Sequence, residues 1–425
     1  MNYKKTVVAV ALIGGIGLGT VSTLDTNNVK ADSHATVSKQ VLTNQVNQVK
    51  NGQSTQQAQS AVTVSSWSEF EAALKDKNVT DVSLNNNIQV EAAFLAKGLT
   101  KNIHGNGHTI DADNHDVKLD TINAVGEIDN AKIVNTNSLG ILWSDLSNVK
   151  VTYRNVEHSG KEMLQLYHGE LILDGTVSST SGSEEVFEGQ HLTINPNAVV
   201  DFSNSSSSSS HSPIQIITSH GKMSVGSGAV LTVNSVAKCI DGVAYTQLEN
   251  NGTMRLKSTA HQAIYLADHG EMNFNKGSRL TAIAHDEVNE GIKAYLGNIY
   301  VHSGATFGVT SSGHQATILA GGKLIFEKGA NYAVVNTNPR GAIFGSDVHT
   351  QVTLQSDNGI RTWNRENVTN ENPDHEYKGE IESSFDIIGI ENTVTQTDMQ
   401  SNNTDFASTF KTKEVGKITG GNFNV

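Results

Sequence analysis

The stretch that decides the fold is residues 297–309, which read GNIYVHSGATFGV. A glycine opens a short alternating strand, a Ser-Gly-Ala turn follows, and a second alternating strand completes the phrase. Variants of this phrase recur at residues 221–233, 270–283 and 322–334, and the last three copies begin 27 and 25 residues apart. A repeat of this length, built from short strands and glycine turns, is typical of a solenoid in which each coil buries its apolar face against its neighbours.

A third short apolar run precedes the next glycine, as at residues 263–266 and 316–319. Three short strands per coil, with connections too short for a crossover helix, predict an all-β fold, a right-handed single-stranded parallel β-helix. An antiparallel sandwich, which also has turns at short intervals, is the alternative. The recurrence of the three-strand phrase as a unit favours the β-helix. Strand alternation then predicts eight inward residues. These are Met223, Val225, Met272, Phe274, Ile299, Val301, Leu324 and Phe326.

The first segment, residues 1–31, is expected to be a signal peptide. Lys4 and Lys5 precede an uncharged apolar run at residues 6–24, and Ala31 supplies a small residue at the cleavage position. The run is long enough to raise the alternative of a membrane span, but four of its residues are glycines. We therefore expect cleavage after Ala31 and no stable membrane span afterwards.

Three further segments follow in the mature chain. Residues 32–62 are rich in Gln, Asn, Ser and Thr and are expected to form a disordered polar spacer. Residues 63–360 are expected to form the parallel β-helix with an N-terminal cap, and residues 361–425 a C-terminal cap or accessory layer. The cap is expected to be a short amphipathic helix at residues 67–75, because Ser66 and Glu69 fit a capping box and Trp67 begins an apolar face.

The charge of the chain limits the classes of molecule that it can bind. The chain has a formal charge of −13, and removing residues 1–31, with three Lys and one Asp, takes it to −15. Nucleic acid is therefore excluded as an expected partner. All sixteen His belong to the mature chain. We expect acidification to remove most of the negative charge, so that binding to anionic glycans strengthens from about pH 7 to about pH 5 and weakens with added salt.

No catalytic constellation is visible in the sequence. A uronate lyase of this fold needs a basic residue beside a cluster of Ca²⁺-binding carboxylates, and a hydrolase needs paired carboxylates. The chain has six Arg, none of them beside an acidic cluster in sequence, and the available carboxylates are Asp241, Asp268, Asp286 and Glu287. Carboxylates from adjacent coils could still converge. The expectation is no enzyme activity, no catalytic residue, no metal site and no cofactor.

Three His-Gly pairs, at His168, His220 and His269, occupy the same place in their coils, at the turn into a strand. With a coil between successive pairs, these histidines are expected to lie roughly 10 Å apart, too far for one metal ion. We interpret them as a repeated turn residue and as a pH-responsive surface.

Glycan binding usually relies on exposed aromatic rings flanked by polar side chains. The candidate ligand-binding residues are Trp143, Tyr153, Arg154, Tyr167 and Trp363. Since alternate residues of a strand point inward, some of these side chains are expected to belong to the core.

Several of these features resemble a known family. Residues 64–74 (VSSWSEFEAAL), residues 103–110 (IHGNGHTI) and the Gly-Ala strand repeats are similar to the pectate-lyase-like adhesive domains of secreted surface proteins of Gram-positive bacteria. The resemblance extends over about residues 62–425 and rests on structural motifs. It implies a parallel β-helix used for attachment rather than cleavage. In several relatives the domain is followed by repeats and a wall anchor; residues 1–425 show neither, so covalent attachment to the wall is not expected from them.

The leading hypothesis is a secreted, non-catalytic, adhesin-like protein that binds host or bacterial surface glycans or glycoproteins, including anionic ones. One alternative is a polysaccharide lyase or hydrolase with an atypical site. Another is a structural component of the cell envelope or matrix, which would have no saturable ligand. The sequence contains no Leu-Pro-x-Thr-Gly sorting motif. The expected location is extracellular, either released or held non-covalently at the cell surface.

Overall fold

The computed structural model describes residues 60–96, 100–206, 208, 210–391 and 393–422. The expected signal peptide and nearly all of the expected spacer lie outside these residues. For residues 60–62 the expectation of a disordered spacer is wrong. They belong to strand β1 (Ser60–Val64), which pairs in parallel with β2 (Val79–Leu84) and ends on the buried Val64. The apolar end of the segment therefore joins the first coil.

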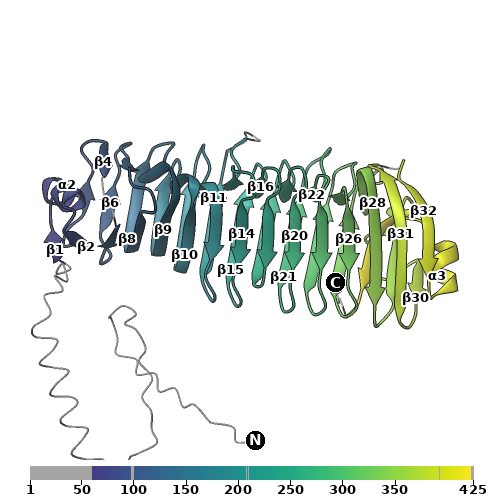
Figure 1. Ribbon diagram of the computed structural model, residues 1–425. Helices are drawn as coiled ribbons and strands as arrows, with labels where there is room; N and C mark the ends of the chain where they lie inside the picture. The colour runs from purple at the N-terminus through teal and green to yellow at the C-terminus, as the bar shows by residue number, and fades with distance from the viewer. Residues whose placement is uncertain (1–59, 97–99, 207, 209, 392, 423–425) are drawn as a thin grey trace, which may run out of the picture. The chain divides into compact units, whose positions relative to one another are not determined.

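The predicted capping helix is confirmed as α2 (Trp67–Lys75), which lies at the N-terminal end of the stack beside β1 and β2 (Figure 1). The Ser66 hydroxyl accepts a hydrogen bond from the Glu69 backbone N–H at 3.4 Å, and the Glu69 carboxylate accepts one from the Ser65 N–H at 2.7 Å. This is a capping arrangement that satisfies amide groups left free at a helix start. Trp67, on the inward face of the helix, is 7% exposed.

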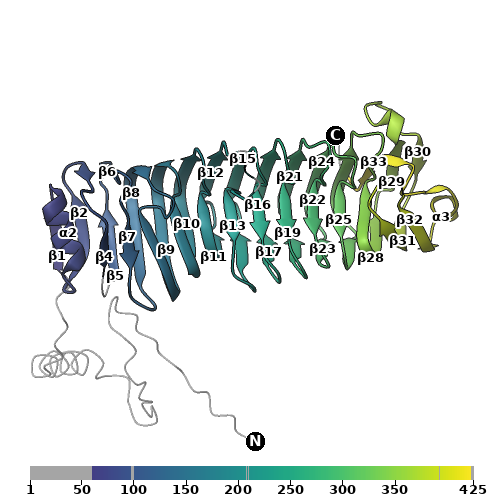
Figure 2. The same ribbon diagram turned by 90° about the horizontal axis from the view of Figure 1, so that it is seen from above.

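The parallel β-solenoid is confirmed, with about eleven turns. Each coil from residue 214 to residue 336 has three strands, and every strand before β27 pairs in parallel with the strand at the same place in the next coil (Figure 2). The strands of the short sheet are β13 (Ile214–Ile216), β16 (Ile240–Gly242), β19 (Ile264–Leu266), β22 (Ile292–Ala294) and β25 (Ile318–Ala320). Those of the middle sheet are β14 (Lys222–Val225), β17 (Gln247–Asn250), β20 (Glu271–Phe274), β23 (Asn298–Val301) and β26 (Lys323–Phe326). Those of the long sheet are β15 (Val230–Ser235), β18 (Thr253–Ser258), β21 (Arg279–Ala284), β24 (Thr306–Ser311) and β27 (Asn331–Asn336).

The core follows the predicted alternation. All eight residues predicted to point inward are at most 1% exposed. The pairing of Ile299 with Leu324 and of Val301 with Phe326 is parallel, which excludes the antiparallel sandwich.

The coils nearer the N-terminus are less regular than the repeat suggests. The first two contain β3 (Ile88–Gln89), β4 (Phe94–Ala96), β5 (Thr100–His104), β6 (Thr109–Asp111) and β7 (Val117–Leu119). The next strands are β8 (Val125–Thr136), β9 (Leu142–Gly160), β10 (Leu164–Ser181), β11 (Phe187–Ile194) and β12 (Val199–Asn204). The expectation of short strands is wrong for β8, β9 and β10, which are continuous around corners. At these corners Asn130, Asn155 and Gly175 have φ of 48°, 53° and 62°, and this left-handed conformation turns a strand without ending it.

Two glycines of the repeated phrase have different physical roles. Gly304, in the turn after β23, has φ of 80°, a conformation that favours glycine. Gly297, which opens the phrase, is needed for close approach, because a Cβ there would lie 1.9 Å from the Gly270 carbonyl oxygen of the preceding coil.

After the last coil the strands change direction. They are β28 (Phe344–Ser356), β29 (Ile360–Asn364), β30 (His375–Tyr377), β31 (Ile381–Gly389), β32 (Thr395–Ser401) and β33 (Val415–Gly420), with helices η1 (Arg365–Asn367) and α3 (Thr404–Thr409). Strand β33 pairs antiparallel with β27, and β31 pairs antiparallel with β28. The outer edges of two of the three sheets are thereby covered by the chain's own C-terminal strands.

Candidate functional site: a cationic groove on the long sheet

A groove of about 600 Å³ crosses the outward side of the long sheet. Its lining residues belong to strands β15, β18 and β21, so three successive coils contribute to it. The lining residues are Thr232, Asn234, Arg255, Leu256, Lys257, Arg279, Thr281 and Ile283. We call this set the cationic groove.

Strand pairing explains why the three cations meet. Arg255 and Lys257 point outward from β18 because Met254 and Leu256 point into the core. Arg255 pairs with Thr281 of β21, and Arg279 lies two residues earlier on that strand. Lys257 and Arg279 therefore lie on opposite sides of the Arg255 position along the strands.

These cations have no counter-charge in the groove. Among the described residues, none of Arg255, Lys257 and Arg279 forms an ion pair, and no carboxylate lines the groove. The nearest acidic residue in the row of Arg255 is Asp201, which pairs with Thr232 and is two strands away, at ~4.8 Å per strand. An uncompensated group of cations on a chain of charge −13 is suited to an anionic ligand.

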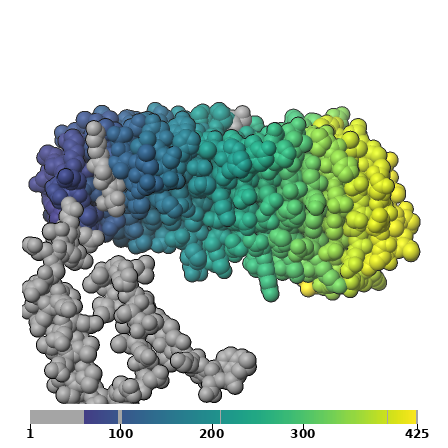
Figure 3. Space-filling view, in the orientation of Figure 1, coloured from purple at the N-terminus to yellow at the C-terminus, as the bar shows by residue number. Residues whose placement is uncertain are grey.

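The neighbouring side chains supply hydrogen-bonding groups. Thr232, Asn234 and Thr281 offer hydroxyl and amide groups around the three cations. The lining residues come from three neighbouring strands of the stack. On the face seen in Figure 3 the coils form a continuous surface without a deep cleft. The arrangement can bind an extended anionic chain, and its lining contains no acid–base pair.

Of the five aromatic and Arg candidates, Tyr153 proved to be a core residue, so the expectation of ligand contact is wrong for it. Trp363 is largely buried but lines a cavity of about 740 Å³ with Arg361 and Lys417, and its contact with a ligand stays a prediction. Tyr153 is fully buried in β9, where it continues the inward alternation of Val149 and Val151. Trp363 is 4% exposed; its indole N–H donates to the Asn370 carbonyl at 3.0 Å, and Lys417 Nζ lies 4.1 Å from its ring centre.

The other three candidates lie on the surface, but at separate places. Trp143 is half-buried; its indole N–H donates to Asp116 at 2.6 Å and its ring carries the Lys118 ammonium group 4.5 Å from its centre. Arg154 is exposed and forms ion pairs with Glu127 at 3.0 Å and Asp174 at 2.8 Å, so its charge is compensated. Tyr167 is 42% exposed. The structure does not bring these three side chains into one site.

His220 and His269 are exposed at turns leading into the middle sheet. His168 is also exposed but lies within strand β10, where it pairs with Ser147, so the interpretation as a repeated turn residue is wrong for His168. The rings of His220 and His269 lie on either side of Tyr245, whose centroid is 4.8 Å from one and 5.1 Å from the other. His168 instead lines a separate groove of about 330 Å³ with Lys150, Glu170, His191 and Lys222. There burial raises the pKa of Glu170, but hydrogen bonds from Lys150 and Thr193 outweigh it and lower the pKa below its usual range.

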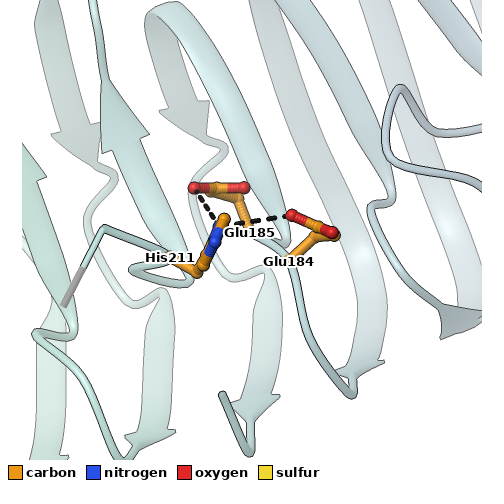
Figure 4. Close-up of side chains that lie close together, drawn as sticks. All are labelled: Glu184, Glu185 and His211. Atoms are coloured by element: carbon orange, nitrogen blue, oxygen red, sulfur yellow. Dashed lines mark hydrogen bonds and ion pairs between the residues drawn. The ribbon is translucent and has the colours of Figure 1, made fainter. Parts of the chain in front are cut away.

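One group of side chains among the described residues has metal-ligand spacing. The ligand atoms of Glu184, Glu185 and His211 lie within 4.8 Å of one another (Figure 4). His211 Nδ1 is 3.2 Å from a Glu184 oxygen and 3.0 Å from a Glu185 oxygen. These residues were not predicted from the sequence. The adjacent Glu184 and Glu185 were a visible signal, whereas the approach of His211 depends on the coil register.

No helix among the described residues has the length and apolarity to cross a membrane.

Comparison with known proteins supports the resemblance noted in the sequence. Residues 61–165 match the family model described as "Putative pectate lyase-like adhesive domain". No curated protein matches the chain. Two solved structures are similar at low identity. The SRRP of L. reuteri 53608 is 19% identical with a TM-score of 0.42, over 64% of this chain and 98% of that one. The SRRP of L. reuteri 100-23 is 17% identical with a TM-score of 0.40, over 64% of this chain and 85% of that one.

Proposed function

We propose that this protein is a secreted, non-catalytic adhesive module that binds anionic surface glycans through the cationic groove. The observation that carries the proposal is the uncompensated group of Arg255, Lys257 and Arg279 on a strongly acidic chain. The match of residues 61–165 to an adhesive-domain family supports attachment as the role of the solenoid.

The chemistry of the groove fits carboxylated sugars. A guanidinium group binds a carboxylate through two parallel hydrogen bonds, and two such groups with one ammonium group give three anion contacts across adjacent coils. The hydroxyl and amide groups of Thr232, Asn234 and Thr281 are partners for sugar hydroxyls. A groove open along the stack suits a polymer better than a small molecule.

The distance between the arginines of the groove and the group of acidic residues near the short sheet supports the absence of catalysis. The arginines of the groove lie on the long sheet with no carboxylate in its lining, whereas Glu184, Glu185 and His211 lie near the short sheet. A uronate lyase needs the base and the metal-binding carboxylates at one place.

The test is saturable binding of the full-length protein to immobilised pectin, a carboxylated polysaccharide. The groove variant carries Arg255→Gln, Lys257→Gln and Arg279→Gln. The control variant carries Lys276→Gln, Lys323→Gln and Arg340→Gln, which removes three exposed cations from other places and changes the net charge equally. We expect at least a tenfold loss of affinity in the groove variant, since each charged contact contributes about 1.5 kcal/mol or more.

The control variant should bind within about twofold of the wild type, because rim charges far from a ligand are screened beyond ~10 Å. An equal loss of affinity in the two variants would show that only the net charge matters. It would refute the groove as the binding site. Binding that never saturates would instead favour a structural role in the envelope or matrix.

A further inference from the structure

The long sheet continues beyond the last coil into the C-terminal cap. Strand β33 pairs with β27, and β29 pairs with β33, so both strands extend this sheet. A cavity of about 740 Å³ lies on the extension, a volume typical of ligand-binding pockets. We call it the cap pocket, and its lining includes Arg361, Trp363, Asn370, Glu376, Lys417 and Thr419.

Alternation along β33 places two polar side chains of the cap pocket on the outward side of the sheet. Ile418 is fully buried in the core, so its neighbours Lys417 and Thr419 point to the other side. These two residues pair with Trp363 and Arg361 of β29. Directly opposed residues of paired strands share a face, so all four belong to the outward side.

Residues 369–373, in the loop between β29 and β30, form one wall of the cap pocket. Two hydrogen bonds fasten this loop to β29. The Trp363 indole N–H donates to the Asn370 carbonyl at 3.0 Å, and the Asn364 backbone N–H donates to the Asp374 carboxylate at 2.7 Å. Figure 2 shows the loop on the same side of the stack as β15, β21 and β24. The wall is therefore in place before a ligand binds, which lowers the cost of binding.

The buried cation of the cap pocket has no counter-charge. Lys417 is 8% exposed, and its Nζ lies 4.1 Å from the centre of the Trp363 ring, which orients the ammonium group but carries no net negative charge. Among the described residues Lys417 forms no ion pair: Glu376 pairs instead with Arg361 at 3.0 Å, and Glu371 is exposed. Burial lowers the pKa of Lys417. A bound anion would offset the cost of holding this ammonium group out of water.

Strand register aligns the cap pocket with the cationic groove. Lys257 of the groove and Lys417 of the pocket belong to one row of opposed residues, which passes through Ile283, Thr310 and Val335. Four strand spacings of ~4.8 Å separate the two lysines, which places them roughly 19 Å apart along the stack.

The surface between the two sites carries no charge along these rows. A neighbouring row joins Arg255 to Arg361 through Thr281, Gly308, Ala333 and Thr419. In both rows the residues between the cations are uncharged. On a chain with a net charge of −13, these rows therefore offer an acidic polymer a path without a repelling carboxylate.

We propose that the cap pocket is a second subsite for an acidic polysaccharide, in which Lys417 binds a sugar carboxylate while the same polymer chain crosses β24 and β27 to the cationic groove. The inference rests on the proposed function for its class of ligand and extends the binding surface beyond the groove. The Thr419 hydroxyl and the Asn370 amide offer partners for sugar hydroxyls.

The experiment is calorimetric titration of full-length protein with two galacturonate oligomers, one too short to reach both lysines and one long enough to span roughly 19 Å. The long oligomer should bind as one molecule per chain and about 10²-fold more tightly than the short one, because binding at the second site becomes intramolecular. Equal affinity of the wild type for the two oligomers would overturn the proposal without any substitution in the pocket.

Three variants test the role of Lys417. Lys417→Met keeps the length of the side chain and removes its charge, and should weaken binding of the long oligomer about tenfold or more, since most of the gain from the second site is lost. Lys417→Arg keeps the charge and should retain most of the binding. The matched control Lys413→Met removes an exposed cation of the cap that lies outside the pocket and should bind as the wild type does. Thermal unfolding of each variant checks that the cap is folded.

The groove variant Arg255→Gln, Lys257→Gln and Arg279→Gln separates this inference from the proposed function. If the groove variant loses binding of the long oligomer but folded Lys417→Met does not, the cap pocket is refuted as a subsite and the proposed function stands. If the groove variant binds the long oligomer as the wild type does, the proposed function fails, and the shared polymer chain fails with it. Loss of binding in both variants, with retention in Lys417→Arg and Lys413→Met, is the result expected.

Discussion

The imidazole ring of His220 stacks on the phenol ring of Tyr245, with 4.8 Å between the ring centroids and 6° between the planes. His269 stacks on the other side of Tyr245 at 5.1 Å and 13°. The three residues occupy the same left-handed turn in consecutive coils, with φ of 63°, 62° and 59°. One imidazole ring therefore lies on each face of the Tyr245 ring.

The first prediction concerns adhesion in acid. Binding to pectin should strengthen between about pH 7 and pH 5 as histidines become charged, and the gain should disappear at high salt because exposed charges are screened. Replacing His168, His220 and His269 by Gln should remove most of this gain. The measurement is binding at both pH values and at low and high salt, with size-exclusion chromatography to detect aggregation.

The matched control replaces His285, His349 and His375, three exposed histidines at other places. If both triple variants lose the gain equally, the effect belongs to net charge and not to His168, His220 and His269. A gain in acid that salt leaves untouched would contradict an electrostatic mechanism altogether.

Much of the fold could be predicted because its information is local and repeated. The alternation in residues 297–301 and 322–326 determines which side chains point inward, and the structure confirms both the burial and the parallel pairing. The capping helix followed from Ser66, Glu69 and Trp67 in the same way. The continuous strand β9 could not be predicted, because Asn155 in a left-handed conformation turns the chain without ending the strand, whereas short strands were expected.

The candidate sites were harder to predict because they depend on register between coils. Arg255 and Arg279 are 24 positions apart in sequence and meet only through the pairing of β18 with β21. Tyr153 could have been assigned to the core from the alternation of Val149, Val151 and Tyr153. No such local signal exists for Trp363, whose ring is covered by Lys417, a residue far along the chain.

The second prediction concerns stability in acid. His158 is buried between the hydroxyl groups of Thr136 at 2.8 Å and Ser179 at 2.7 Å, and burial lowers its pKa from 6.5 to about 4. The unfolded chain therefore binds a proton at this residue before the folded chain does. Its neutral form supports folding fully above pH 6.5, and this support should be lost as pH falls to about 4, by on the order of 3 kcal/mol.

Chemical denaturation at pH 7, 5.5 and 4.5 measures this loss. In a His158→Gln variant the free energy of unfolding should be lower than in the wild type at pH 7, and the difference should shrink towards pH 4.5. A parallel pH dependence in wild type and variant would show that His158 does not resist protonation in the folded chain.

The third prediction is the absence of turnover on pectic substrates. The groove offers arginines without a carboxylate to hold Ca²⁺ or to act as acid and base, so no unsaturated or reducing product should accumulate with or without added Ca²⁺. Product formation followed by ultraviolet absorbance and reducing-sugar assay is the check. Turnover that disappears on Asp241→Asn, Asp268→Asn or Asp286→Asn would refute the adhesive function.

The last prediction tests the reason for the repeated glycine. In Gly297→Ala the new Cβ would lie 1.9 Å from the Gly270 carbonyl oxygen. Because that oxygen belongs to the backbone and the position of a Cβ is fixed by its own backbone, one coil must shift against the next. We expect a loss of about 1–3 kcal/mol in the free energy of unfolding, the usual cost of overpacking. In the control Gly126→Ala, the new Cβ would lie 3.5 Å from the Lys101 carbonyl oxygen, an ordinary contact, and stability should change little. The measurement is the denaturation midpoint of each variant, compared with that of the wild type. If Gly297→Ala were as stable as Gly126→Ala, the coils would be able to move apart at this turn, and the glycine would not be required by close approach.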